Sequence, residues 1–124
     1  MKHENNKICY TNEKLKEIIE KHKKWLNYEK DGEKADLQGA DLRNADLQGT
    51  NLQGADLDFS CLPLWCGSLL ANMDDRQVKQ LLYHILSIVK HSNNVSETIK
   101  AALLTDKNIK IAKEFHRANE CNKL

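Results

Sequence analysis

The sequence predicts an α+β protein in which a short β-solenoid lies between two helical flanks. Two observations predict this fold. Residues 35–59 repeat with a period of five, and the residues on either side carry apolar stripes at helical spacing. A chain of 124 residues has the length of one domain. We therefore expect one compact unit, made of a capping helix within residues 1–34, a solenoid over 35–71 and a helical region over 72–124.

The first expected element is an amphipathic helix over residues 12–28. Thr11 or Asn12 can cap its start, and Asp31-Gly32 supplies turn chemistry after its end. A single helix cannot bury its apolar stripe alone, so we expect it to pack on the segment that follows. The stripe comprises Leu15, Ile18, Ile19, His22, Trp25 and Leu26.

The repeat consists of five units in frame, with the sequences ADLQG, ADLRN, ADLQG, TNLQG and ADLDF, and SCLPL continues it as a sixth. Within a unit the small residue and the Leu are two positions apart, so they share one side of an extended chain. If the chain turns after each unit, every Leu faces a common axis. The expected repeat core is Leu37, Leu42, Leu47, Leu52, Leu57 and Leu62.

Tandem units of the form A(D/N)LXX resemble the pentapeptide-repeat family, and they cover about a quarter of the chain. The resemblance implies a right-handed four-sided β-helix, of which this segment would form about 1.5 coils. Residues twenty apart would then stack, with Asp36 over Asp56 and Asp41 over Cys61. So short a solenoid leaves strand edges open, so we expect the flanking helices to cap its ends or a second copy to pair with it.

The register of five breaks after Leu64, where Trp65-Cys66 are inserted, and we expect the solenoid to end across residues 60–71. A helix is then expected from Asp74-Asp75 to His91. Its main stripe is widened by Leu86 and Ile88, and a stripe of that width is usually covered on two sides. The main stripe comprises Val78, Leu81, Leu82, Ile85 and Val89.

Two shorter helices complete the expected C-terminal region. Asn94 and Glu97 form a capping box for a helix that reaches Leu104, and Thr105 caps a last helix over residues 106–117.

Charge and composition exclude several classes of function. The net charge is +1, and the repeat carries five Asp and one Arg, so neither DNA nor an anionic membrane is an expected partner. The family includes inhibitors that imitate DNA, but 1.5 coils are too short to imitate a useful length of duplex. The start of the chain lacks a signal-peptide pattern and no apolar run could span a bilayer. A cytoplasmic location and reduced cysteines are therefore expected.

The aligned carboxylates of the repeat are candidates for acid–base or metal chemistry. Asn51 fills the same position in the fourth unit, however, which favours a structural role for an outward-facing Asp or Asn. We therefore predict no catalytic residues, no bound metal and no cofactor.

An alternative class is a zinc-binding protein or a small enzyme dependent on Cys and His, such as a hydrolase. Zinc would use Cys61, Cys66, His116 and Cys121, although the four residues between Cys61 and Cys66 are at the edge of the range in familiar zinc sites. A nucleophile would pair Cys61 or Cys66 with one of the histidines at positions 84, 91 and 116.

The most unusual segment lies where the repeat fails, and it is our candidate for ligand binding. Trp65 beside Gly67 and Ser68 offers an aromatic surface and backbone donors, whereas the structural alternative is a plug at the end of the solenoid. The candidate ligand-binding residues are Pro63, Trp65, Cys66, Gly67, Ser68 and Arg76.

We expect a non-enzymatic binding or assembly protein that acts as a homo-oligomer. The helix before the repeat resembles that of short bacterial and prophage proteins of the family. This resemblance implies a phage-type protein that antagonises host defence, either by binding a host protein or by sequestering a small nucleotide signal.

Overall fold

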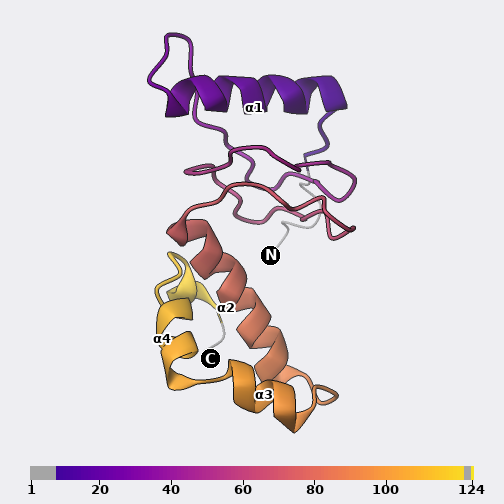
Figure 1. Ribbon diagram of the computed structural model, residues 1–124, viewed down its shortest axis with the longest axis vertical. Coiled ribbons are helices and arrows are strands. Elements are labelled where there is room, and N and C mark those ends of the chain that lie inside the picture. The colour runs from indigo at the N-terminus through magenta and orange to yellow at the C-terminus, as the bar shows by residue number, and fades with distance from the viewer. Residues whose placement is uncertain (1–7, 122–123) are drawn as a thin grey trace. The chain divides into compact units, whose positions relative to one another are not determined.

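Figure 1 shows the computed structural model, which describes residues 8–121 and residue 124. The chain divides into two compact units, Met1–Asp74 and Asp75–Leu124, and each is described by itself. Within the described residues, no helix has both the length and the apolar character needed to cross a membrane. The helices are α1 (Asn12–Leu26) in the first unit and α2 (Asp75–His91), α3 (Glu97–Leu103), α4 (Asp106–Ala112) and the 3-10 helix η2 (Ala118–Glu120) in the second.

Helix α1 confirms the prediction made from its apolar stripe and its cap. The side chain of Thr11 accepts a hydrogen bond from the Lys14 N–H at 3.1 Å, which satisfies a donor of the first turn. The helix ends at Leu26, and Tyr28 lies beyond it with φ 57°, in the left-handed region. Leu15 is buried in the core of the first unit, so α1 packs on the repeat segment as expected.

The repeat segment, residues 35–72, does not form the predicted right-handed four-sided β-helix. The described residues contain no β-strand. Turns recur at every fifth residue, and the short pieces between them meet only in isolated parallel bridges, such as those that join Asp36 to Asp56 and Asn51 to Asn72. The prediction of a β-solenoid is therefore wrong. The physical reason is length, because pieces of two or three residues between turns are too short for a continuous ladder of hydrogen bonds.

The predicted stacking of residues twenty positions apart is confirmed by two bridges, Asp36 with Asp56 and Asp41 with Cys61. At the first bridge, the Leu37 N–H donates to the Asp56 carbonyl at 2.8 Å, and the Asp56 N–H donates to the Ala35 carbonyl at 3.2 Å. The core of the first unit is built from the third position of each repeat. Leu37, Leu42, Leu47, Leu52 and Leu57 are buried, whereas Leu62 is half-buried.

The imidazole of His22 joins α1 to the repeat segment. Its side chain is 0% exposed; Nδ1 accepts a hydrogen bond from the Ala35 N–H at 3.0 Å, and Nε2 lies 2.8 Å from the Gln53 carbonyl oxygen. A carbonyl oxygen only accepts, so the proton must be on Nε2 and the ring is neutral. Burial lowers the pKa of His22, and the charge of Lys34 lowers it further, against the opposing effect of the bond to Gln53.

The indole of Trp25 covers this contact. Its ring stacks on that of His22 with centroids 5.4 Å apart. Gly54 lies against the same indole, and a Cβ at that position would come within 3.1 Å of Trp25 Cζ3. Gly54 also has φ 80°, a conformation that glycine adopts at little cost. Both the close approach and the backbone angle therefore require glycine here.

Residue Ile8 closes one edge of the repeat segment. It forms a parallel bridge with Ala40. The Ile8 N–H donates to the Gly39 carbonyl at 3.0 Å, and the Asp41 N–H donates to the Ile8 carbonyl at 2.8 Å. The Gly39 carbonyl and the Asp41 N–H are thereby satisfied.

The second unit packs α2 against α4 and the residues after it. Tyr83 and Leu86 of α2 form a buried cluster with Ala112, Phe115 and Leu124. The ammonium group of Lys79 lies 2.7 Å from the Glu114 carboxylate and reinforces the same contact.

Three details of the second unit differ from the sequence predictions. Ser96 rather than Asn94 caps α3, because its hydroxyl accepts from the Ile99 N–H at 3.3 Å. Helix α4 ends at Ala112, five residues before the predicted end. Val78 and Ile85, both placed in the main apolar stripe, are 53% and 51% exposed.

Replacing Leu47 by alanine tests the leucine core. Leu47 is 0% exposed, so Leu47→Ala should lower the free energy of unfolding of the first unit by about 2–5 kcal/mol. Urea unfolding followed by circular dichroism measures the change. Leu64→Ala is the matched control, because Leu64 is 85% exposed and its truncation should cost much less. Equal losses in the two variants would contradict a core built on the third repeat position.

Stability of the first unit should depend on the protonation of His22. Because the folded pKa is lowered, the unfolded chain takes up the proton first as the pH falls below about 6.5. The contribution of His22 is therefore complete above that pH and is lost progressively below it. The free energy of unfolding is measured from pH 8 to pH 5, and we expect this loss in the wild type. His91→Gln, at an exposed histidine, is the control and should show the same loss. His22→Gln should show a smaller loss. The same pH dependence in His22→Gln would show that other groups cause it.

Candidate interaction surface

The candidate site is the loop in which the repeat register changes, residues 63–70, which we call the insertion loop. Before it, the Leu42 N–H donates to the carbonyl of Cys61, nineteen positions later. After it, the Leu47 N–H donates to the carbonyl of Ser68, twenty-one positions later. The two additional residues confirm the predicted insertion of Trp65-Cys66.

Ser68 anchors the insertion loop. It is 0% exposed, and its hydroxyl oxygen lies 2.5 Å from the Pro63 carbonyl oxygen and 2.6 Å from that of Trp65. Its N–H also donates to the Trp65 carbonyl at 3.1 Å, while its own carbonyl accepts from Leu47. Pro63 is buried beside it. These bonds hold a sharp turn against the core and fix the backbone that carries the next side chains.

Gly67 is required in this turn by its backbone angle. Its φ is 77°, which side chains other than glycine adopt at a cost, while a Cβ would meet nothing within 4 Å. Space beside Gly67 is therefore open, and conformation alone selects glycine at this position.

Large apolar side chains project from this fixed backbone. Leu64 is 85% exposed, Leu70 is 65% exposed and Trp65 is 48% exposed. Sequence reasoning selected Trp65 but missed Leu64 and Leu70. A signal for Leu64 was present, because it occupies the fifth, turn position of its unit, where the first four units have Gly or Asn.

Of the six candidate ligand-binding residues, the structure places five in the insertion loop. Cys66 is exposed at its tip as a free thiol. Arg76 lies in the first turn of α2 in the second unit, where its Nη2 is 3.4 Å from Nε2 of His116.

The cysteines and histidines of the alternative class are divided between the two units. Cys61 and Cys66 belong to the first unit, and His116 and Cys121 belong to the second; all the cysteines are free thiols. Among the described residues, no cluster of three or more potential metal ligands includes a cysteine.

The Asp and Asn residues of the repeat form its turns. The side-chain oxygen of the second residue of a unit accepts from the N–H two positions later, as Asp36 does from Gln38 at 3.1 Å and Asn51 from Gln53 at 3.2 Å. Asp46 and Asp41 make the same bond. This bonding gives a physical reason for Asp or Asn in that position.

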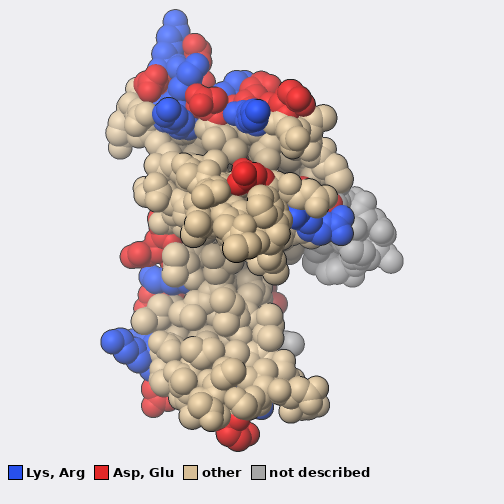
Figure 2. Space-filling view, turned by 45° about the vertical axis from the view of Figure 1, so that its right-hand side comes forward, with Lys and Arg blue, Asp and Glu red and all other residues tan. Residues whose placement is uncertain are grey.

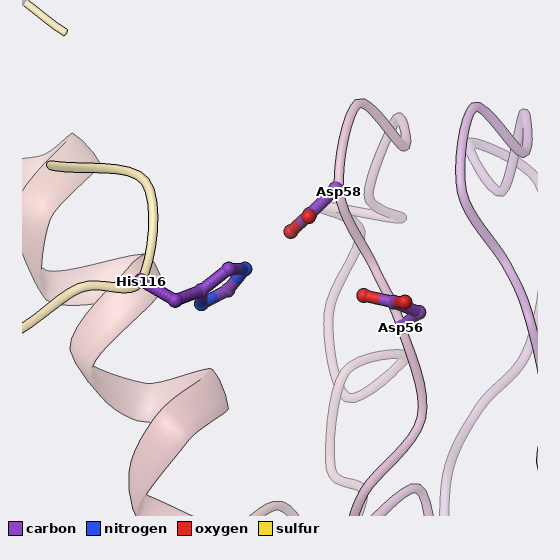
Figure 3. Close-up of side chains that lie close together, drawn as sticks. All are labelled: Asp56, Asp58 and His116. Carbon is purple, nitrogen blue, oxygen red and sulfur yellow. The ribbon is translucent and has the colours of Figure 1, made fainter. Parts of the chain in front are cut away.

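Carboxylates of the repeat also pair with side chains nearby. Arg43 donates from Nε and Nη2 to both carboxylate oxygens of Asp41, and these bonds lower the pKa of Asp41 to about 2. Asp56 accepts from the Gln38 amide at 3.0 Å. Figure 3 shows Asp56 and Asp58 pointing to the same side of the repeat segment, as residues two apart in extended chain do. His116, also drawn there, belongs to the second unit.

A charged concavity of about 180 Å³ lies between α1 and the start of the repeat segment. Its acidic and basic side chains are mixed, and Lys21 lies 3.5 Å from Glu17 and 3.8 Å from Glu33. Figure 2 shows Lys, Arg, Asp and Glu side chains gathered over α1. The lining consists of Lys14, Glu17, Ile18, Lys21, Glu33, Lys34, Ala35 and Asp36.

Comparison with known families identifies the repeat. Residues 33–63 match the family model described as pentapeptide repeats (8 copies), so this chain carries a pentapeptide-repeat segment, as predicted. The match covers about a quarter of the chain and does not include the second unit. No curated protein and no solved structure matches the chain.

Removing the Ser68 hydroxyl should loosen the insertion loop. We expect Ser68→Ala to lower the unfolding free energy of the first unit by about 1–3 kcal/mol, because the buried bond between the hydroxyl and the Pro63 carbonyl is lost. In a Trp25→Phe background Trp65 is the sole tryptophan, and its emission should shift to the red. Ser60→Ala, at a half-buried serine of the preceding unit, is the control. Identical stability and emission in the two variants would contradict the anchoring role.

Proposed function

We propose that the protein is a non-enzymatic binding module whose insertion loop docks an apolar surface of a partner protein. The observation that carries this proposal is the exposure of Leu64, Trp65 and Leu70 on a backbone that Ser68 fixes to the core. Exposed apolar groups on a rigid support bind with a small loss of conformational entropy. Trp is also the residue type most enriched among those that dominate binding energy.

The chemistry of the loop favours a protein over a nucleotide or a nucleic acid. Residues 59–73 contain no Lys, Arg, Asp or Glu, although 30% of the whole chain is charged. Phosphate groups are bound by Arg and Lys or by helix N-termini, which the insertion loop lacks. An uncharged apolar loop is instead suited to an uncharged apolar surface.

The concavity beside α1 gives little support to sequestration of a nucleotide. Its volume of about 180 Å³ is below the roughly 300–1,000 Å³ of most small-molecule sites. Its carboxylates would also repel a phosphate. Binding of a host protein is therefore the version of the predicted function that we retain in this proposal.

Peptide selection can test the proposal while the partner is still unidentified. A displayed library of random peptides is selected on the wild-type protein, and the binding of enriched peptides is then measured by calorimetry. We expect the enriched peptides to be apolar and to bind Trp65→Ala at least tenfold more weakly than the wild type. Central aromatic anchors contribute roughly 1.4 kcal/mol or more to the free energy of binding. Tyr28→Ala is the matched control, since Tyr28 is an aromatic side chain of the same unit and is 98% exposed.

Two outcomes would overturn the proposal. One is that the enriched peptides bind Trp65→Ala as tightly as the wild type. The other is that a cyclic or ADP-ribose-type nucleotide gives heat on titration that Trp65→Ala retains and Lys34→Ala abolishes, because the concavity beside α1 would then be the functional site.

A further inference from the structure

Helix α2 carries apolar side chains on two faces, and the second unit covers one of them. Tyr83, Leu86 and Val89 are 2%, 0% and 6% exposed. The first two pack in the cluster with Ala112 and Phe115, and α4 runs beside α2 in Figure 1. This side of α2 has its partner within the unit.

A second apolar face of α2 remains open to solvent. Val78 is 53% exposed, Ile85 is 51% exposed and Ile88 is 63% exposed, and Leu81 between them is half-buried. Successive steps of three, four and three residues place these side chains in one stripe along the helix. We call these four residues the α2 stripe.

The α2 stripe is symmetric about position 83. Val78 and Ile88 are five positions on either side of it, and Leu81 and Ile85 are two positions on either side. Two copies of α2 that pair antiparallel about a two-fold axis would therefore bring Val78 against Ile88 of the other copy, and Leu81 against Ile85. An isologous interface requires this self-complementarity, because the same patch must meet itself.

The helix dipoles, with Asp75 at the start of each helix, favour the same arrangement. The first turn of α2 carries Asp75 and Arg76, and its last turn carries Lys90 and His91. Antiparallel pairing opposes the two helix dipoles, and it places Asp75 of each copy near the basic last turn of the other. A parallel pair would place like charges together.

We propose that the α2 stripe is the interface of a homodimer in which two α2 helices pair antiparallel. The partner surface is a second copy of this chain. The interface is small, so the dimer dissociates reversibly with dilution. This inference rests on the second unit and is independent of the function proposed for the insertion loop in the first.

Sedimentation velocity over a hundredfold range of protein concentration tests the interface. We expect the wild type to pass from monomer to dimer and Ile85→Asp to raise the dissociation constant at least tenfold. Ile99→Asp is the matched control, since Ile99 is 48% exposed on α3 outside the stripe, and it should dimerise like the wild type. Trp65→Ala should also dimerise normally, which separates this interface from the insertion loop.

Engineered disulfides test the antiparallel direction. With the four native cysteines replaced by serine, the pair Val78→Cys and Ile88→Cys in one chain should oxidise to a covalent dimer. Val78→Cys alone should not, because ten residues of helix separate the two copies of position 78 by about 15 Å.

The proposal is overturned if the wild type stays monomeric at every concentration. That result would overturn it even if another part of the same chain covered the α2 stripe. It is also overturned if Ile85→Asp dimerises like the wild type. Efficient cross-linking through Val78→Cys alone would show parallel pairing and would contradict the proposed geometry.

Discussion

A turn at every fifth residue is the constraint on which the first unit depends. It brings the third residue of each unit inward and makes the leucine core, and it leaves the second residue free to bond the turn that follows. The same constraint limits the extended pieces to a few residues, so neighbouring layers meet at single bridges such as Asp36–Asp56 and not along strands. The fold of this unit is therefore determined mainly by side chains that bond the turns or pack in the core. A continuous ladder of backbone hydrogen bonds contributes little.

His22 shows how a helix is attached to such a segment. A layer of turns offers isolated backbone donors and acceptors, here the Ala35 N–H and the Gln53 carbonyl. A neutral imidazole has one donor and one acceptor and can serve both. An aliphatic side chain would supply the burial but would leave two polar groups without a partner. The histidine thus combines the packing role of the helix stripe with a polar contact that fixes the register of α1.

Much of this organisation could be predicted from the sequence, and the exceptions have physical causes. The Thr11 cap of α1 and the acidic start of α2 gave correct helix starts because local chemistry decides them, whereas α1 ends at Leu26, two residues before its predicted end. The β-helix prediction failed because a period of five defines where the chain turns and does not define how much ladder forms between turns. The role of His22 depended on contacts 13 and 31 positions away in sequence, which no local pattern contains. Leu64 and Leu70 were missed because the repeat pattern marks the inward leucines and does not define the exposure of residues outside its third position.

The bridge from Ile8 to Ala40 has a consequence for behaviour at high concentration. An open edge of extended backbone is a template on which further chains can add, and growth of this kind leads to fibres. Here Ile8 occupies the Gly39 carbonyl and the Asp41 N–H, so that these two backbone groups are not available to another chain. Ile8 therefore protects this edge against pairing with further chains, a task separate from folding stability or recognition.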